Sequence, residues 1–287
     1  MCKSPDSGKK EQGQRTATVM NKKYELTDET KMSRTGTVLH RIRAVKSFTN
    51  SHGEEVHAGD LGGWIENEYN LFQTGNSWVC GEAKVFGSAR VLGEALIYGS
   101  AEVFNSAQVY DAAHVGDDAR VFGSAHICGN ARVCGSSEVY GSASVCDEAL
   151  VYGNAKVYEN AGVCGVAEVC GYAAVYGNAR IYGDARVFGN ADVYGEAIVS
   201  GDAKVKGSLD YAVFKNTWSS GRFFTYTRSN KMWTVGCFHG TGEVLIAKAY
   251  KDSELSGKCY EAIVRVQEAI DKAMEHSSKH IEEEGRQ

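Results

Sequence analysis

An aliphatic residue recurs at every sixth position from Val79 to Val205, through 22 consecutive hexads without an insertion or deletion. It is Val or Ile each time, and alanine follows four positions later in 20 of the 22 hexads, with Ser137 and Leu209 as the exceptions. Repetition at a fixed period is typical of solenoids, in which each unit buries its apolar side only against neighbouring units. The middle of the chain is therefore predicted to be a stack of short, nearly identical elements.

Each hexad reads as one short strand and one corner. Because side chains of a strand alternate between its two faces, Ala83 and Val85 point inward and Lys84 points outward. The residue two positions after the aliphatic one is usually Gly, which adopts positive φ freely and turns the corner. Asn and Asp tolerate that conformation best after Gly, whereas Glu is a strained choice. Five corners carry such a replacement: Asn105, Asp111, Asp117, Asp147 and Glu159.

The residues that directly follow the aliphatic position indicate how many hexads close one coil. Sorting them by threes yields one series that is aromatic at all seven positions, and sorting by fours or fives yields none. The series is Phe86, Phe104, Phe122, Tyr140, Tyr158, Tyr176 and Tyr194. Three hexads per coil predict an all-β solenoid, a parallel β-helix with triangular coils of 18 residues and about seven coils.

Both flanks of the repeat differ from it in pattern. Alternating stretches before Val79 predict a small β cap on the first coil, because an open coil end is a bare sheet edge. After the repeat, we expect a hairpin about Ser229–Lys231 and then helical segments. The predicted organisation is a disordered tail (1–22), an N-terminal β cap (23–78), the β-helix (79–210), a C-terminal hairpin and helical cap (211–275) and a tail (276–287).

Composition narrows the functional class. A formal net charge of −5 argues against general nucleic-acid or membrane-surface binding. The chain has no run of 18 apolar residues for a transmembrane helix, and its N-terminal stretch has no apolar core of a secretory signal. We expect a cytoplasmic protein in which the nine cysteines are reduced.

An aliphatic residue, a small residue four positions later and three hexads per coil resemble the hexapeptide-repeat superfamily of left-handed parallel β-helices. That resemblance implies left-handed winding, and most superfamily members are acyltransferases that use CoA or acyl-carrier thioesters, usually as trimers. The chain is also similar to bacterial and phage YdcK-type proteins, regarded as acetyltransferase-like. The similarity rests on K-Y-E-L-T at Lys23–Thr27, A-G-D-L-G-G-W-I-E at Ala58–Glu66, the V-Y-G-N-A hexads and G-C-F-x-G-T at Gly236–Thr241.

The repeat contains few groups suited to catalysis. An acyltransferase of this kind needs a histidine base, and only His114 and His126 lie in the hexads. They are 12 residues apart, so they are expected on two different faces as half-exposed polar residues. Histidines of the caps, including His52, are expected to be surface residues. No hexad carries the inserted loop that builds a substrate cleft.

No metal site or cofactor is predicted. Cys128, Cys146 and Cys164 recur at 18-residue spacing and should stack about 4.8 Å apart, too far apart for thiolates around one tetrahedral zinc ion. We expect them to fill a corner as small apolar groups. Acyl-CoA is the expected cofactor only if the chain is an acyltransferase.

The favoured hypothesis is a non-catalytic β-solenoid scaffold that binds a ligand or partner and forms a homo-oligomer, with a trimer favoured. It self-associates through a face of the solenoid or through the C-terminal element. One alternative is an acyltransferase with clefts between subunits, for which His114 and His126 are the candidate bases. Another is sequestration of a small metabolite or signalling nucleotide. The candidate binding residues are Tyr98, Tyr110, His114, His126, Arg132, Tyr152, Arg180 and Tyr182.

Overall fold

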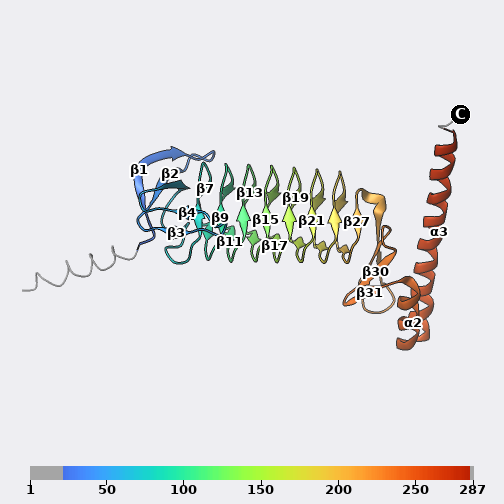
Figure 1. Cartoon of the computed structure of the whole chain (residues 1–287). Helices are drawn as coiled ribbons and strands as arrows, with labels where there is room; N and C mark the ends of the chain where they lie inside the picture. Colours follow the sequence, from blue (N-terminus) through green and yellow to red (C-terminus); the bar gives the residue numbers. More distant parts are fainter. Residues whose placement is uncertain (1–21, 285–287) are drawn as a thin grey trace, which may run out of the picture. The chain divides into compact units, whose positions relative to one another are not determined.

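The computed structural model describes residues 22–284, with side chains described as far as His276 (Figure 1). The chain divides into two compact units with a boundary between Gly141 and Ser142. The predicted disordered tail lies outside the described residues, apart from Lys22. The predicted C-terminal tail lies partly within them, because helix α3 (Glu254–Glu284) continues to Glu284.

The hexads form a parallel β-solenoid, and the two units together carry about eight turns of it. Every hexad contributes a strand of two residues, and hexads three apart pair in parallel, which gives three sheets as the sequence predicts. In the first unit, the first sheet contains β7 (Lys84–Val85), β10 (Glu102–Val103), β13 (Arg120–Val121) and β16 (Glu138–Val139). The second contains β8 (Arg90–Val91), β11 (Gln108–Val109) and β14 (His126–Ile127). The third contains β6 (Trp78–Val79), β9 (Leu96–Ile97), β12 (His114–Val115) and β15 (Arg132–Val133).

The second unit repeats the same three sheets. Its first sheet contains β19 (Lys156–Val157), β22 (Ala174–Val175) and β25 (Asp192–Val193). Its second contains β17 (Ser144–Val145), β20 (Gly162–Val163), β23 (Arg180–Ile181) and β26 (Ile198–Val199). Its third contains β18 (Leu150–Val151), β21 (Glu168–Val169), β24 (Arg186–Val187) and β27 (Lys204–Val205).

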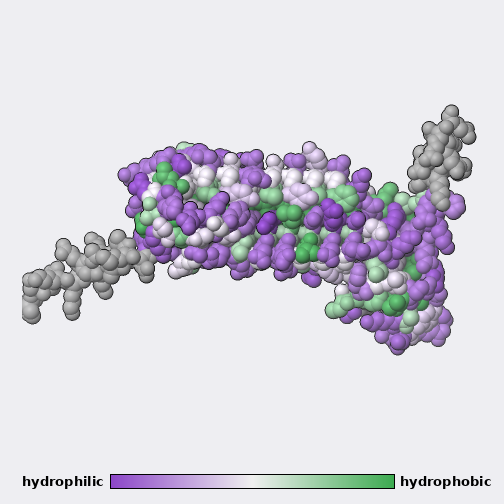
Figure 2. Space-filling model, in the orientation of Figure 1, coloured by the Kyte–Doolittle hydropathy of each residue, from purple (hydrophilic) through white to green (hydrophobic). Residues whose placement is uncertain are grey.

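The inward residues form the core of each unit. The aliphatic residue of every hexad and the alanine two positions before it are almost fully buried. Ser137, which replaces one alanine, is also buried, and its hydroxyl donates a hydrogen bond to the carbonyl oxygen of Cys134 at 2.8 Å. On the outside, hydrophilic residues predominate but apolar side chains show between them (Figure 2). The prediction that the aliphatic residue and the alanine of each hexad point inward is confirmed.

The corners have the predicted backbone conformation. The corner Gly has positive φ in every hexad except the last, where Gly207 is extended with a φ of −155°. The replacements also have positive φ, 56° at Asp111 and 58° at Glu159. The carboxylates of these replacements accept a hydrogen bond from the corner N–H of the next coil. Asp111 Oδ2 lies 3.1 Å from Gly129 N, and Glu159 Oε2 lies 2.9 Å from Gly177 N. These contacts offset part of the cost of a left-handed non-glycine residue.

Within each unit the aromatic series forms a column of stacked rings on the first sheet, as expected for coils of three hexads. Phe86 and Phe104 lie 5.0 Å apart between ring centroids in the first unit, and Tyr158 and Tyr176 lie 4.9 Å apart in the second. Nearly parallel rings at this spacing follow from in-register strands about 4.8 Å apart.

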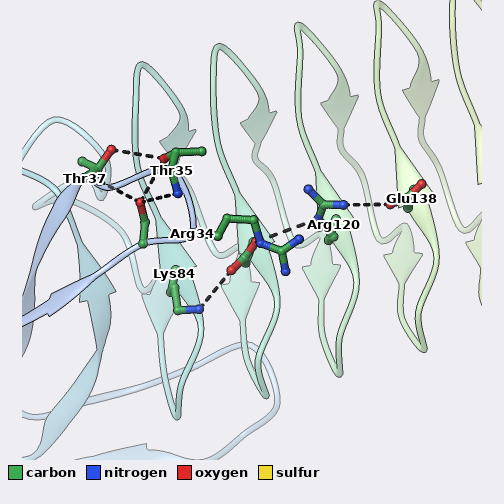
Figure 3. Close-up of polar contacts among 8 residues, drawn as sticks. Arg34, Thr35, Thr37, Lys84, Arg120 and Glu138 are labelled. Carbon is green, nitrogen blue, oxygen red and sulfur yellow. Dashed lines mark hydrogen bonds and ion pairs between the residues drawn. The ribbon is translucent and has the colours of Figure 1, made fainter.

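A ladder of alternating charges lies on the first sheet of the first unit (Figure 3). Glu102 is 3% exposed, and its carboxylate lies 2.9 Å from the Lys84 ammonium. Arg120 pairs with Glu138 at 2.9 Å. Arg34, at the tip of the N-terminal hairpin, adds an ion pair with Glu102 at 2.9 Å. The ladder therefore fixes the hairpin on the solenoid.

The N-terminal cap continues the first sheet and adds one turn to the predicted count. Strands β1 (Tyr24–Met32) and β2 (Val38–Ala44) are antiparallel, and β5 (Leu61–Ile65) pairs in parallel with β7. Ile65 aligns with Val85, Leu71 with Val91 and Val79 with Ile97. Two extra residues between Leu71 and Val79 interrupt the period of six, which is why the count from the sequence begins one turn late.

The C-terminal element contains more structure than the predicted hairpin. A short 3₁₀ helix, η1 (Ser208–Asp210), precedes a four-stranded antiparallel sheet of β28 (Tyr211–Lys215), β29 (Phe223–Thr227), β30 (Met232–Val235) and β31 (Phe238–Gly240). Strands β29 and β30 form the predicted hairpin. Helices α2 (Gly242–Asp252) and α3 follow, and an apolar cluster that includes Phe224, Trp233 and Leu245 is buried between sheet and helices.

Candidate functional site

The predicted binding residues separate into four groups. His114 lies on β12 of the third sheet and His126 on β14 of the second, so the prediction that they occupy different faces is confirmed. The third sheet brings together Tyr98, His114 and Arg132 in the first unit. Tyr110 and His126 share the second sheet there. In the second unit, Tyr152 follows a strand of the third sheet, and Arg180 and Tyr182 belong to the second.

His114 lies beneath a loop of the N-terminal cap. The loop joins β3 (Phe48–Thr49) and β4 (Glu55–Val56). Ser51 Oγ lies 2.9 Å from His114 Nε2, and His52 Nε2 lies 3.0 Å from His114 Nδ1. His114 is only 7% exposed, not half-exposed as expected from its place in the hexad, because this loop covers it. Burial, reinforced by His52 and Arg132, lowers the pKa of His114 to about 4.

The surroundings of His114 limit its chemistry. A neutral imidazole has one donor and one acceptor nitrogen, and both nitrogens are engaged here whichever way the hydrogens point. The backbone N–H groups of His52 and Glu54 donate to the side chain of Asn50 and are therefore not available to an oxyanion. The cluster fastens the cap to the third sheet, and His114 is not placed to accept a proton from a substrate held elsewhere.

The Tyr110–His126 and Tyr152 groups show simple side-chain contacts. The rings of Tyr110 and His126 meet edge to face with centroids 6.4 Å apart. Hydrogen bonding with Cys170, together with burial, raises the pKa of Tyr152. Both contacts join side chains of neighbouring coils within one sheet.

The second sheet of the second unit is hollowed by small outward residues. Its outward column reads Ser144, Gly162, Arg180 and Ile198. Among the hexads, Gly162 is the only glycine at an outward strand position. Its φ lies outside the left-handed region, and a Cβ placed there would meet only Ser144 Oγ, at 3.6 Å. The missing side chain therefore opens space beside Arg180.

Two adjoining hollows follow from this column, and we call them together the Gly162 groove. One measures about 420 Å³ and the other about 460 Å³. Asn160 and Arg180 line both hollows and so lie where they join. The residues lining the groove are Ser144, Cys146, Asn160, Gly162, Val163, Cys164, Asn178, Arg180, Tyr182, Glu196 and Ile198.

Polar groups of the groove are arranged for hydrogen bonding. Asn160 Nδ2 donates to Asn178 Oδ1 at 3.1 Å, and Asn178 Nδ2 donates to Glu196 Oε1 at 2.7 Å, which fixes one wall. Cys164 and Tyr182 form the other wall, and burial raises the pKa of the Cys164 thiol, which keeps it neutral. The Arg180 side chain is exposed and has no ion-pair partner within residues 22–276.

Sequence reasoning identified Arg180 and Tyr182 but missed the residue that creates the space. The signal was available, because Gly162 departs from the outward pattern of polar or large residues. The asparagine wall was missed because its residues belong to corners, which the hexad pattern marks only as small and polar.

Residues 179–194 match the family model of the YdcK β-solenoid repeat. This short match supports a solenoid repeat of that kind for the part of the chain that contains Arg180 and Tyr182. A search of curated proteins found no match.

Two further findings concern metal ions and membranes. Over the described residues, no three His, Cys, Asp or Glu side chains converge as a metal ion would require. None of the helices in that part of the chain is sufficiently long and apolar to span a bilayer.

Proposed function

We propose that this protein is a non-catalytic β-solenoid scaffold that binds a small anionic ligand in the Gly162 groove. The observation that carries the proposal is the exposed Arg180 guanidinium, which has no ion-pair partner among the described residues and lies beside the space left by Gly162. The ligand class is a small molecule with a carboxylate or phosphate group. This is the chemistry that sequestration of a small metabolite or nucleotide requires.

The groove suits such a ligand in size and in chemistry. Each hollow lies within the range of about 300–1,000 Å³ that is usual for ligand sites. A guanidinium presents its donors in a planar fork that matches carboxylate and phosphate oxygens. The amides of Asn160 and Asn178 supply uncharged donors and acceptors on the same side, so they favour a ligand with additional polar groups.

Self-association is the second part of the proposal. Helix α3 packs one side against α2 and the C-terminal sheet, and its opposite side exposes Leu255, Val266 and Ile270, which are 62%, 54% and 42% exposed. An exposed apolar stripe of this kind is typical of a protein contact. We propose that copies of the chain associate through it, with a trimer as the state that the hexapeptide resemblance favours. Light scattering should show a smaller assembly for Val266→Lys than for Lys251→Gln, and equal masses would contradict this part.

The acyltransferase alternative receives less support. Its expected base, His114, has both ring nitrogens engaged by residues of the same unit. His126 lies on another sheet. The hexapeptide-like, left-handed character of the coils stays a prediction from the resemblance.

Calorimetric titration tests the groove directly. Adenosine monophosphate and citrate serve as anionic probes, and adenosine serves as the uncharged counterpart. We expect Arg180→Gln to weaken binding of both anions at least about tenfold, or about 1.4 kcal/mol. Gly162→Leu should abolish binding, because its side chain fills the groove without backbone strain.

Ala174→Leu is the matched control, because Ala174 is an outward residue at the same hexad position on the first sheet. It should bind the anions as the wild type does. The proposal fails if neither anion binds, if adenosine binds as well as its monophosphate, or if Gly162→Leu binds normally.

A further inference from the structure

A separate cavity of about 340 Å³ lies in the C-terminal element, between the β30–β31 hairpin and helices α2 and α3. Its floor is apolar, because Val235, Leu245 and Ala249 are buried side chains that line it. Phe238 and Tyr260 add aromatic walls. Apolar residues reach the surface in this part of the molecule, near β31 and α2 (Figure 2). The cavity can therefore accept an apolar group.

Two cations line the same cavity. Lys248 Nζ lies 5.6 Å from the centroid of the Phe238 ring, which holds the ammonium group at the aromatic wall. Arg222 Nη1 would lie 3.8 Å from a Cβ at Gly236, so the guanidinium is at the tip of the hairpin. Neither cation has an ion-pair partner within the described side chains, and Asp252 is the one acidic residue of the lining.

An apolar floor below two unpaired cations selects for a particular ligand chemistry. An apolar body gains by leaving water, and a carboxylate-type head gains by pairing with Arg222 and Lys248. A cationic ligand of equal size would gain only from the transfer of its apolar body out of water, and its charge would be repelled by both Arg222 and Lys248. We propose that this cavity binds an amphipathic organic anion, with its head between the two cations and its apolar part against Val235 and Leu245.

The hairpin also provides a reporter for occupancy. Gly236 and Cys237 form the two-residue connection between Val235 and Phe238, and Gly236 has a φ of 57° as such a turn requires. Cys237 lines the cavity and is exposed, whereas the other cysteines of the described residues are half-buried. An occupant should therefore shield the Cys237 thiol from a reagent in solution.

The test measures alkylation of Cys237 by iodoacetamide in the full chain, with octanoate and octylammonium as probes. Octanoate should slow alkylation severalfold at saturation, and octylammonium should leave it nearly unchanged. The double variant Arg222→Gln, Lys248→Gln should raise the octanoate concentration needed for half-protection at least about tenfold. Lys251→Gln, on the same helix but outside the lining, is the matched control and should behave as the wild type.

A charge reversal keeps the proposal falsifiable if the double variant folds poorly. Lys248→Glu should shift the preference from octanoate toward octylammonium. Equal protection by both probes in the wild type would mean that the cavity selects only for apolar groups, and absence of protection by octanoate would mean that it is not a site for such anions. Either result overturns the proposal. Arg180→Gln should leave this assay unchanged, which separates it from the Gly162 groove.

Discussion

The buried His114 should make the stability of the first unit dependent on pH in a way that one substitution removes. Its pKa falls from the ordinary 6.5 to about 4 on folding. Because the folded pKa is the lower one, the unfolded chain binds a proton first as the pH falls. The free energy of unfolding should therefore decrease between pH 6.5 and pH 4 and be independent of this residue above that window.

The magnitude follows from the size of the shift. One pKa unit corresponds to about 1.36 kcal/mol, so the full shift sets a ceiling of about 3 kcal/mol at pH 4. Only part of this loss of unfolding free energy is reached at pH 5, and solvent near the covering loop reduces the loss further. We therefore expect the free energy of unfolding to fall by about 1–2 kcal/mol at pH 5.

Urea denaturation followed by circular dichroism at pH 7.5, 6.5, 5.5 and 5.0 measures this loss. His114→Gln should be less stable at pH 7.5 by about 1–2 kcal/mol, because it loses contacts with Ser51 and His52. Its stability should then change little between pH 6.5 and pH 5. His126→Gln is the matched control and should keep the wild-type slope. If His114→Gln retains that slope, the buried neutral imidazole is not its cause.

Two further predictions concern the coils. Glu102→Ala should lower the free energy of unfolding by about 2–3 kcal/mol, because the buried carboxylate pairs with Lys84 and Arg34. Glu168→Ala removes a more exposed ion pair and should lower it by less than about 1 kcal/mol. Urea denaturation measures both losses, and equal losses would contradict the role of burial. At the corner where Glu159 has positive φ, Glu159→Gly should be more stable than Glu159→Ala by about 1 kcal/mol. Both variants lose the hydrogen bond to Gly177, but only Gly removes the backbone strain of the left-handed conformation. Thermal unfolding compares the two variants, and equal melting temperatures would contradict this explanation.

The sequence is most informative where structure repeats locally. The alternation of Val and Ala, the corner φ values and the three-hexad coil all follow from a period that recurs 22 times. The turn that begins at Ile65 was not predicted from the sequence, because two extra residues before Val79 break the period of six. A constant spacing makes the repeat predictable, and one insertion is sufficient for a coil to be missed.

Contacts between distant segments were much harder to predict. Ser51 and His52 reach His114 across more than 60 residues, and Arg34 reaches Glu102 across a similar separation. No periodic pattern encodes these pairs, because they depend on how the cap folds back. The four-stranded C-terminal sheet was likewise reduced to a hairpin, since only β29 and β30 are joined by an evident turn.

The candidate site was predicted in part, for a related reason. Arg180 and Tyr182 were identified as outward residues of one face, which the hexad register determines. The groove arises instead from the absence of a side chain at Gly162, combined with the asparagine wall from neighbouring coils. Such a hollow is a property of three coils together and is visible only once their register is known.

Native mass spectrometry of the protein purified from its own host tests the central claim most directly. We predict that the wild type and Ala174→Leu carry the same additional small anionic mass, and that Gly162→Leu lacks it. A wild-type protein without any adduct, or an adduct that persists in Gly162→Leu, would contradict the claim that the Gly162 groove is the binding site.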